Sequence, residues 1–224
     1  MSKITHDYIV DFLHEIQPVD QSIGGLIYRL EEEAKETGVP IIPIEVKSFI
    51  STILAIHKPR RILEIGAAIG YSSIVMSQYL QEGGEIVTIE RQEPMLKRLY
   101  SNLKEANLTN VVKVMEGTAE DVFPNLTGEF DFVFIDAAKG QYNYFLEESL
   151  KVLRVGGIII ADNVLHKGAV AKSRYDIPRR QRTIHKRLRN FLYTVVDDVQ
   201  LKSSILPIGD GVVICYKEGA KENE

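Results

Sequence analysis

Two apolar runs of the sequence end in carboxylates, an arrangement from which a metal site can be built. F-D-F-V-F-I-D ends at Asp136, and G-I-I-I-A-D ends at Asp162, which Asn163 follows. Both runs have the composition of buried strands, and the carboxyl ends of strands line the ligand crevice of an open α/β sheet. The three side chains are therefore expected to converge and to offer oxygen ligands to Mg²⁺ or another hard divalent cation. Taken singly, each could instead cap the segment that follows it.

Lys139 follows Asp136 closely, in D-A-A-K-G-Q-Y. On the loop after the strand it would stand beside a bound metal, whose positive charge disfavours the ammonium form of a lysine. We therefore predict that Asp136 and Lys139 are catalytic and that Lys139 is the general base. Without a metal site, a solvated surface lysine would be the simpler interpretation.

The stretch R-I-L-E-I-G-A-A-I-G-Y, residues 61–71, has the pattern of a strand, a tight turn and a helix. Gly66 and Gly70 let the backbone turn sharply and let a ligand approach closely. About 20 residues further on, Glu90 ends a second strand-like run, where doubly wound folds place the acid that binds a ribose diol. The spacing differs from the three-glycine dinucleotide motif, and Glu64 would repel a diphosphate but suit an ammonium group. The pattern therefore favours S-adenosylmethionine over NAD.

Strand and helix patterns alternate regularly from residue 61 onwards. Strands are expected at 61–66, 85–90, 111–116, 130–136, 157–162, 200–207 and 211–217, and helices at 71–81, 93–106 and 141–153. Alternation of this kind predicts a doubly wound, mostly parallel, Rossmann-like α/β sheet of seven strands. The last two strands are separated by the turn signal G-D-G, so the final strand should be antiparallel.

Helical periodicity over 4–16 and 20–36 predicts two helices ahead of this core. The segment V-P-I-I-P-I, residues 39–44, cannot be helical because each proline restricts its predecessor, and a third helix follows it. We expect a single domain over 1–224, with a helical cap at 1–58 and a Rossmann-like core at 59–217. The apolar loop either covers a ligand site or simply links the two parts.

The composition of the chain limits the classes of function that the protein can have. The formal net charge is −4, which gives no global attraction to nucleic acid. No apolar run approaches the length of a membrane span, and the single cysteine, Cys215, excludes a disulfide within the chain. These features predict a soluble, cytoplasmic protein.

Five motifs resemble one enzyme family: E-I-G-A-A-I-G-Y-S-S (64–73), T-I-E (88–90), E-G-T-A-E (116–120), F-I-D-A-A-K-G-Q-Y (134–142) and A-D-N-V-L (161–165). They resemble the cation-dependent class I S-adenosylmethionine O-methyltransferases of the catechol and caffeoyl-CoA type, over about residues 40 to 217. Within that family, D-A-A-K-G-Q-Y, D-N-V-L-H-K-G and P-I-G-D-G are most similar to the bacterial tRNA 5-hydroxyuridine methyltransferases. The segment D-A-A-K lacks the aromatic residue that catechol enzymes carry before the lysine, and the chain has no tryptophan.

The resemblance implies a role for each matching position. Asp136, Asp162 and Asn163 would bind the metal, Lys139 would be the base, and the protein would be a homodimer. The residues that would contact S-adenosylmethionine are Ile42, Glu64, Gly66, Ser72, Glu90, Gly117, Thr118, Ala119 and Asp136.

A basic segment follows the predicted metal ligands. Between residues 167 and 189 the only acid is Asp176, against nine cations: Lys167, Lys172, Arg174, Arg179, Arg180, Arg182, Lys186, Arg187 and Arg189. Phosphates around an unstacked base of a tRNA anticodon loop would find counter-charges there. Together with the resemblance to the tRNA 5-hydroxyuridine methyltransferases, which implies the acceptor, this segment leads us to expect methylation of 5-hydroxyuridine in tRNA to 5-methoxyuridine. The alternatives are a small-molecule O-methyltransferase acting on catechol-like hydroxyls, with these cations forming a solvated face or a dimer contact, and a non-catalytic scaffold.

Overall fold

The predicted seven-stranded sheet is present in the computed structural model, which describes residues 4–18 and 20–219. The strands follow the order β3-β2-β1-β4-β5-β7-β6. Pairing is parallel between β1 and β2, β2 and β3, and β4 and β5, whereas β7 is antiparallel to both β5 and β6. The last strand of the chain is therefore the reversed one, as predicted.

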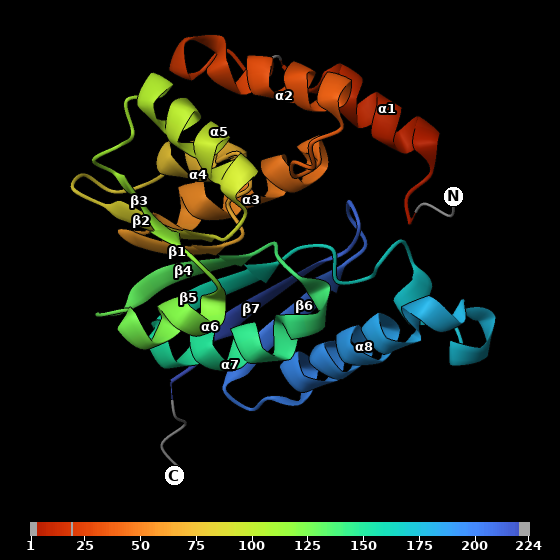
Figure 1. The fold of residues 1–224 in the computed structure, drawn as a ribbon. Coiled ribbons are helices and arrows are strands. Elements are labelled where there is room, and N and C mark those ends of the chain that lie inside the picture. Colours follow the sequence, from red (N-terminus) through yellow and green to blue (C-terminus); the bar gives the residue numbers. More distant parts are fainter. Residues whose placement is uncertain (1–3, 19, 220–224) are drawn as a thin grey trace. The chain divides into compact units, whose positions relative to one another are not determined.

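The chain divides into two compact units (Figure 1). We call residues 7–125 the glycine-turn unit, and residues 126–224 together with 1–6 the aspartate unit. The predicted division into a cap at 1–58 and a core at 59–217 stays a prediction, as does the homodimer. No helix in the described ranges combines the length and the apolar character that crossing a membrane requires.

The glycine-turn unit contains three parallel strands and the helices around them. Its strands are β1 (Arg61–Ile65), β2 (Glu85–Glu90) and β3 (Val112–Glu116). Its helices are α1 (Asp7–Ile16), α2 (Leu26–Thr37), α3 (Ile44–His57), α4 (Tyr71–Ser77), α5 (Glu93–Glu105) and α6 (Ala119–Val122), with short 3₁₀ turns at Ile23–Gly25 and Phe123–Asn125. Strands β1 and β2 are almost wholly buried, as expected of parallel strands covered on both faces.

The helix expected at 4–16 begins at Asp7, and two further helices are shorter than predicted by several residues. The helix expected at 20–36 begins at Leu26, because Gly24 and Gly25 adopt left-handed φ angles of 64° and 78°. The helix expected at 71–81 ends at Ser77, and the N–H of Gln81 bonds the carbonyl of Pro59 instead of a helical carbonyl. Both differences depend on local turn geometry, to which hydrophobic periodicity is insensitive.

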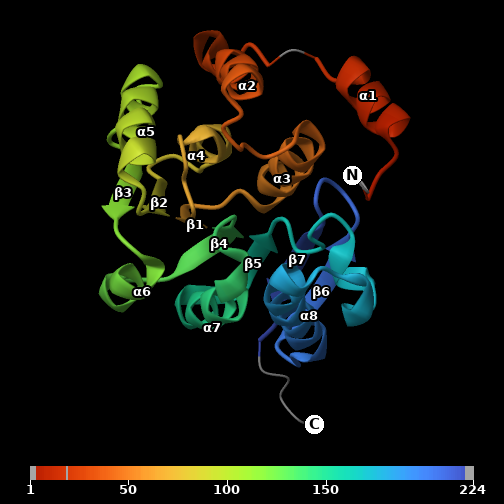
Figure 2. The same ribbon diagram turned by 45° about the vertical axis from the view of Figure 1, so that its right-hand side comes forward.

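The aspartate unit contains β4 (Phe130–Ile135), β5 (Leu153–Ala161), β6 (Leu201–Leu206) and β7 (Val212–Lys217). Its helices are α7 (Tyr142–Val152) and α8 (Arg182–Asp197), with 3₁₀ turns at Lys139–Gln141, Ala169–Ala171, Arg174–Asp176 and Arg179–Gln181. Helix α7 packs on β4 and β5, and α8 packs on β6 and α7 (Figure 2).

Packing explains how these elements form. The three phenylalanines of β4 are completely buried, so this strand is a continuous apolar run with both faces covered. Helix α8 buries His185, Leu188, Phe191 and Val195 at helical spacing, which leaves its cations on the opposite face. Strand β5 begins before the predicted residue 157, and its register with β4 shifts at the point where Gly156 has a φ of 80°.

Candidate active site

Asp136 and Asp162 stand at the same edge of the sheet because β4 and β5 are parallel neighbours. Ile135 pairs with Ala161, and the N–H of Asp162 donates to the carbonyl of Ile135 at 3.0 Å. The next residue completes the group, since Nδ2 of Asn163 lies 3.3 Å from Oδ1 of Asp136. The structure thus gathers all three predicted metal ligands within the aspartate unit.

Asp162 is the most deeply buried of these side chains, with 1% of its surface exposed. Its Oδ1 accepts the N–H of Asn163 at 2.6 Å, whereas its buried Oδ2 has no hydrogen-bond partner among the residues described. Burial, and next the charge of Asp136, raise the pKa of Asp162 to about 7. Burial also raises the pKa of Asp136, which the ammonium of Lys139 partly offsets.

These residues fit a hard cation. A buried carboxylate oxygen without a partner is costly, and a divalent cation would satisfy it and stabilise both charged aspartates. No three His, Cys, Asp or Glu side chains gather as a metal-binding group in ranges 4–18 and 20–219. The predicted set draws its third oxygen from an asparagine, and its role as a metal site stays a prediction.

Tyr142 stabilises the backbone at this edge of the sheet. Its hydroxyl donates to the carbonyl of Asp162 at 2.8 Å, and its ring meets Phe191 of α8 edge-on at 5.4 Å between centroids. The side chain is fully buried, and burial raises the pKa of Tyr142 well above its ordinary value. The first residue of α7 thereby fixes the backbone that carries two predicted ligands.

Lys139 connects the predicted metal ligands to a further acid, Asp210. Its Nζ lies 3.2 Å from Oδ1 of Asn163 and 3.3 Å from Oδ2 of Asp210. The other oxygen of Asp210 accepts the backbone N–H of Lys167. Sequence reasoning missed Asp210, because G-D-G was interpreted only as a turn signal. An acid held between two glycines after a strand was the available clue.

The loop after Asn163 is held in an unusual conformation. Asn163, His166 and Lys167 have left-handed φ angles of 61°, 46° and 55°, which non-glycine residues seldom adopt. The N–H of Leu165 donates to the carbonyl of Asp210 at 3.0 Å, and a Cβ added at Gly211 would lie 2.4 Å from Leu165. The P-I-G-D-G turn therefore packs closely on this loop and keeps its shape.

The glycine-turn unit builds the predicted cofactor turn around Glu90. Gly66 and Gly70 have φ angles of 100° and 84°, as the sequence required of them. Oε2 of Glu90 accepts the N–H of Ala68 at 2.9 Å, while its backbone carbonyl accepts the N–H of Gly117 at 2.9 Å. Glu90 thus fixes the turn between β1 and α4 and joins it to the end of β3.

The other predicted cofactor residues lie in the same unit. Glu64 is fully buried on β1, and its Oε2 accepts the hydroxyls of Ser73 and Thr88. This burial places Glu64 beneath the turn as a support. Ser72 lies in the first turn of α4, Thr118 caps α6, and Ala119 and Ile42 are buried. Contact of these side chains with a cofactor stays a prediction.

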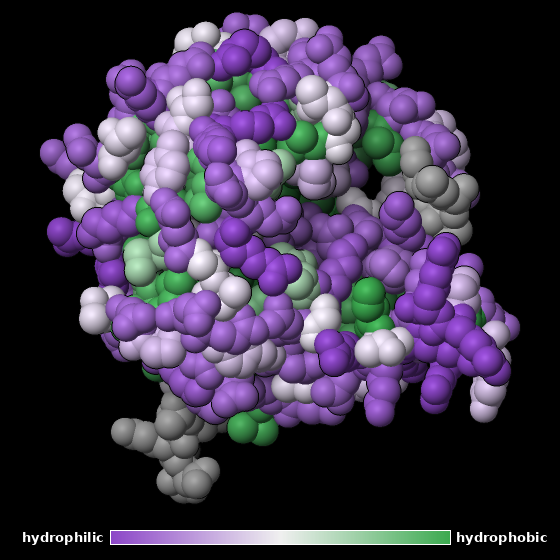
Figure 3. All heavy atoms as spheres, in the orientation of Figure 1, coloured by the Kyte–Doolittle hydropathy of each residue, from purple (hydrophilic) through white to green (hydrophobic). Residues whose placement is uncertain are grey.

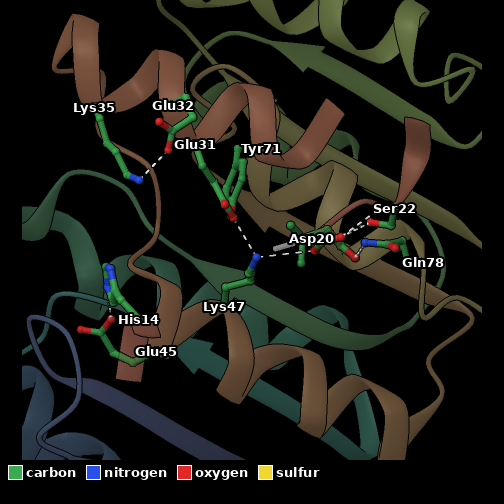
Figure 4. A network of polar contacts seen from close by, with 11 residues as sticks. His14, Asp20, Ser22, Glu31, Glu32, Lys35, Glu45, Lys47, Tyr71 and Gln78 are labelled. Atoms are coloured by element: carbon green, nitrogen blue, oxygen red, sulfur yellow. Dashed lines mark hydrogen bonds and ion pairs between the residues drawn. The ribbon is translucent and has the colours of Figure 1, made fainter. Parts of the chain in front are cut away.

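A partly buried ion-pair network connects helices α2 and α3 to this turn (Figure 4). Nζ of Lys47 lies 2.7 Å from Oε1 of Glu31 and 3.5 Å from Oδ2 of Asp20. The hydroxyl of Tyr71 donates to the same Glu31 oxygen at 2.5 Å, and burial followed by this bond raises the pKa of Tyr71. Because Tyr71 directly follows Gly70, the network fastens helix α2 to the start of α4.

The part of the basic segment that precedes α8, residues 167–181, is bonded to that helix through three helix side chains, Arg182, His185 and Arg189. Arg182 donates to the carbonyl of Ile177 at 3.2 Å, and Arg189 donates to that of Val170 at 3.0 Å. Five exposed cations have side chains with no hydrogen bond or ion pair within the described ranges: Lys172, Arg174, Arg179, Arg180 and Lys186. Figure 3 shows strongly hydrophilic side chains projecting from this part of the surface.

Comparison with known proteins identifies the family. A family model described as "O-methyltransferase" matches residues 26–218. The chain belongs to this O-methyltransferase family. It is 29% identical to a caffeoyl-CoA O-methyltransferase of Populus kitakamiensis, over 79% of this chain and 77% of that one. It is 33% identical to a catechol O-methyltransferase of Niastella koreensis, over 60% of this chain and 64% of that one.

A similar fold has been solved with SAH, the product that the methyl donor leaves, in place. The O-methyltransferase of Bacillus cereus in complex with SAH superposes with a TM-score of 0.81 at 26% identity, covering 94% of this chain and 97% of that one. The protein is therefore an S-adenosylmethionine-dependent O-methyltransferase of the caffeoyl-CoA and catechol type.

Proposed function

We propose that this O-methyltransferase methylates 5-hydroxyuridine in the anticodon loop of tRNA, with Mg²⁺ or another hard divalent cation. The observation that carries this proposal is the set of five exposed cations without acidic partners in the basic segment, which begins a few residues after Asn163. Cations left unpaired on a surface that borders the reaction site suit a polyanionic substrate. Tyr175, 85% exposed between Arg174 and Asp176, adds a side chain on which an RNA base could stack.

The aspartate unit supplies the groups that this reaction needs. Asp136, Asp162 and Asn163 would hold the cation, which when bound would lower the pKa of the acceptor hydroxyl. Lys139 is placed to take the hydroxyl proton on Nζ, and Asp210, 3.3 Å away, would stabilise the ammonium so formed. The hydroxyl oxygen then bonds the methyl carbon as the carbon–sulfur bond breaks, which yields a methyl ether and S-adenosylhomocysteine.

The second candidate is methylation of a small catechol-like molecule. It is supported by the names of the relatives, which act on caffeoyl-CoA and catechol. Both candidates use an acceptor with two neighbouring oxygens, so the same side chains at Asp136 and Lys139 would serve either reaction. They differ in whether the basic segment contacts the substrate.

Transfer of labelled methyl groups separates the two. The acceptors are tRNA from a strain that lacks this protein and a simple catechol, each with Mg²⁺ and with a chelator. We expect metal-dependent label on an anticodon uridine, which decreases steeply as salt rises because phosphate contacts are lost. Label on catechol alone, insensitive to salt, would overturn the proposal.

A further inference from the structure

A pocket of about 300 Å³ opens beside the predicted metal site, within the aspartate unit. Its wall is formed by the loop after Asn163 and by the three 3₁₀ turns that follow: His166, Lys167, Ala169, Lys172, Asp176, Ile177, Pro178 and Gln181. The volume is at the lower end of the range of small-molecule sites. None of these residues belongs to the predicted metal or cofactor set.

The pocket lies close to the reaction site. Lys167 is the fourth residue after Asn163, and such a stretch of chain spans at most about 14 Å. The backbone of Lys167 is also bonded to Asp210, which in turn contacts Lys139. A ligand in the pocket and an acceptor at Lys139 would therefore lie close enough to belong to the same short stretch of a nucleic-acid strand.

The pocket wall combines apolar, cationic and hydrogen-bonding side chains, which are the groups that a nucleotide-binding site needs. Ile177, 4% exposed, and Pro178 supply an apolar surface for the face of a base. Lys172 is exposed and its ammonium has no partner in the described part of the chain, so it is available to a phosphate. Gln181 and Asp176 add an amide and a carboxylate that can bond a base edge or a ribose hydroxyl.

The wall is held in place before any ligand binds. Helix α8 secures two of its carbonyls: Arg182 donates to Ile177 at 3.2 Å, and Nε2 of the buried His185 lies 3.1 Å from the carbonyl oxygen of Lys172. Pre-organisation of this kind lowers the entropic cost of binding. These two bonds fix the backbone of the pocket wall at Ile177 and Lys172.

We propose that this pocket binds a nucleotide directly adjacent to the methylated one, with its base against Ile177 and Pro178 and its phosphate at Lys172. The assignment rests on the proposed tRNA function. It gives Lys172, the one exposed unpaired cation of the described pocket wall, a phosphate to bind.

The test uses stem-loop RNAs that carry one 5-hydroxyuridine, either intact or with an abasic residue on its 5′ or its 3′ side. Ala169→Leu fills the pocket and Lys172→Ala removes the phosphate contact. The control is Lys186→Ala, an exposed cation of the same basic segment outside the pocket. Methylation kinetics are measured with the whole protein, and equilibrium binding of the RNA is measured separately without methyl donor by fluorescence anisotropy.

With intact RNA we expect both pocket variants to raise KM and the dissociation constant about fivefold to twentyfold, with kcat nearly unchanged, as for the loss of one base contact or one phosphate contact. With one of the abasic RNAs the effect of Ala169→Leu should vanish, because the base that it displaces is already absent. Lys186→Ala should weaken binding of intact and abasic RNA equally.

An Ala169→Leu effect of the same size on all three RNAs, or no effect on any, would overturn the pocket assignment while RNA methylation by the unchanged protein still stood. If the unchanged protein methylated no RNA, the proposed function itself would fail. Melting temperatures of the variants show whether each is folded, and Lys172→Ala, at an exposed position, tests the pocket if Ala169→Leu does not fold.

Discussion

The carboxylate of Asp210 lies 3.3 Å from Nζ of Lys139, the predicted general base. The two residues are far apart in the sequence, and within the described ranges Asp210 is the one acid at ion-pair distance from Lys139. Asp210 also accepts the N–H of Lys167, so one side chain holds both the lysine and the loop that borders the pocket. We interpret Asp210 as a positioning residue.

Asp210→Ala is expected to lower kcat about tenfold to a hundredfold, the loss of about 1.5–3 kcal/mol that a hydrogen bond to a charged group contributes. KM for the methyl donor should change little, because Asp210 contacts none of the predicted cofactor residues. Asp210→Asn retains an oxygen for Lys139 and should recover part of the rate. Steady-state kinetics of all three proteins check this, and equal losses in kcat for Asn and Ala would contradict a role that depends on the retained oxygen.

Tyr142→Phe tests the support beneath Asp162. The variant loses the 2.8 Å hydrogen bond and leaves a buried carbonyl without its donor, which costs about 1–3 kcal/mol. For a protein of this size that corresponds to a decrease in melting temperature of roughly 2–12 °C. Tyr193→Phe is the matched control, because its exposed hydroxyl only accepts a bond from Arg189, and it should melt within about 1 °C of the unchanged protein.

Equal melting temperatures of the Tyr142→Phe and Tyr193→Phe variants would show that the buried hydrogen bond contributes nothing to the stability of the fold. Calorimetric titration with Mg²⁺ gives a second measurement. If Tyr142 holds the backbone of Asp162 and Asn163 in position, its loss should weaken Mg²⁺ binding as well as stability.

Glu85 gives a pH-dependent prediction in the glycine-turn unit. The Lys113 ammonium, then Arg61, hold the pKa of Glu85 below its ordinary value against the opposing effect of burial. A carboxyl whose folded pKa is lowered stabilises the protein above its unfolded pKa, and the contribution is lost as pH falls through the folded value. Glu85→Gln should therefore lower the melting temperature at neutral pH, and this effect should disappear once the pH has fallen through the lowered folded-state pKa of Glu85.

The expected change in melting temperature is small, because the side chain of Lys113 is 62% exposed and water screens its ion pair with Glu85. Raising the salt concentration at neutral pH should reduce it further. A Glu85→Gln difference that was the same at neutral and acidic pH would mean that shape, and not charge, accounts for the loss.

The sequence could predict some residues of the candidate site but not others. Asp136 and Asp162 were predictable because each ends an apolar strand, and parallel strands bring such ends together. The role of Asp210 was not predictable in this way, because it depends on the antiparallel pairing of β7 with β5, which fixes where the P-I-G-D-G turn lies. Nothing in the hydrophobic pattern indicates that a turn residue reaches a lysine on another loop.

The pocket was also beyond sequence reasoning, for a related reason. Its wall consists of 3₁₀ turns, whose positions are set by side chains of α8 bonding their carbonyls. The charge count identified the basic segment, but it could not distinguish cations that hold the backbone, such as Arg182 and Arg189, from those that remain available to a ligand. That distinction requires the three-dimensional contacts.

Gly70 and Gly83 form a matched pair that separates backbone strain from steric clash. Both have left-handed φ angles, of 84° and 71°, so alanine at either position costs about 1–2 kcal/mol of strain. A Cβ at Gly70 would also lie 2.5 Å from Cδ1 of Leu99, whereas one at Gly83 would meet nothing within 4 Å. Gly70→Ala should therefore be more destabilising than Gly83→Ala by about 1–3 kcal/mol, the usual cost of overpacking.

Urea unfolding of the two variants measures this difference, and adding Leu99→Ala tests its cause. Removing the Leu99 side chain makes room for the new methyl group, so in that background Gly70→Ala should cost only the strain that Gly83→Ala costs. If the excess cost of Gly70→Ala persisted without the Leu99 side chain, contact between the turn and α5 would not be its source. The requirement for glycine would then arise from the backbone of the turn itself, which the bond from Ala68 to Glu90 holds in place.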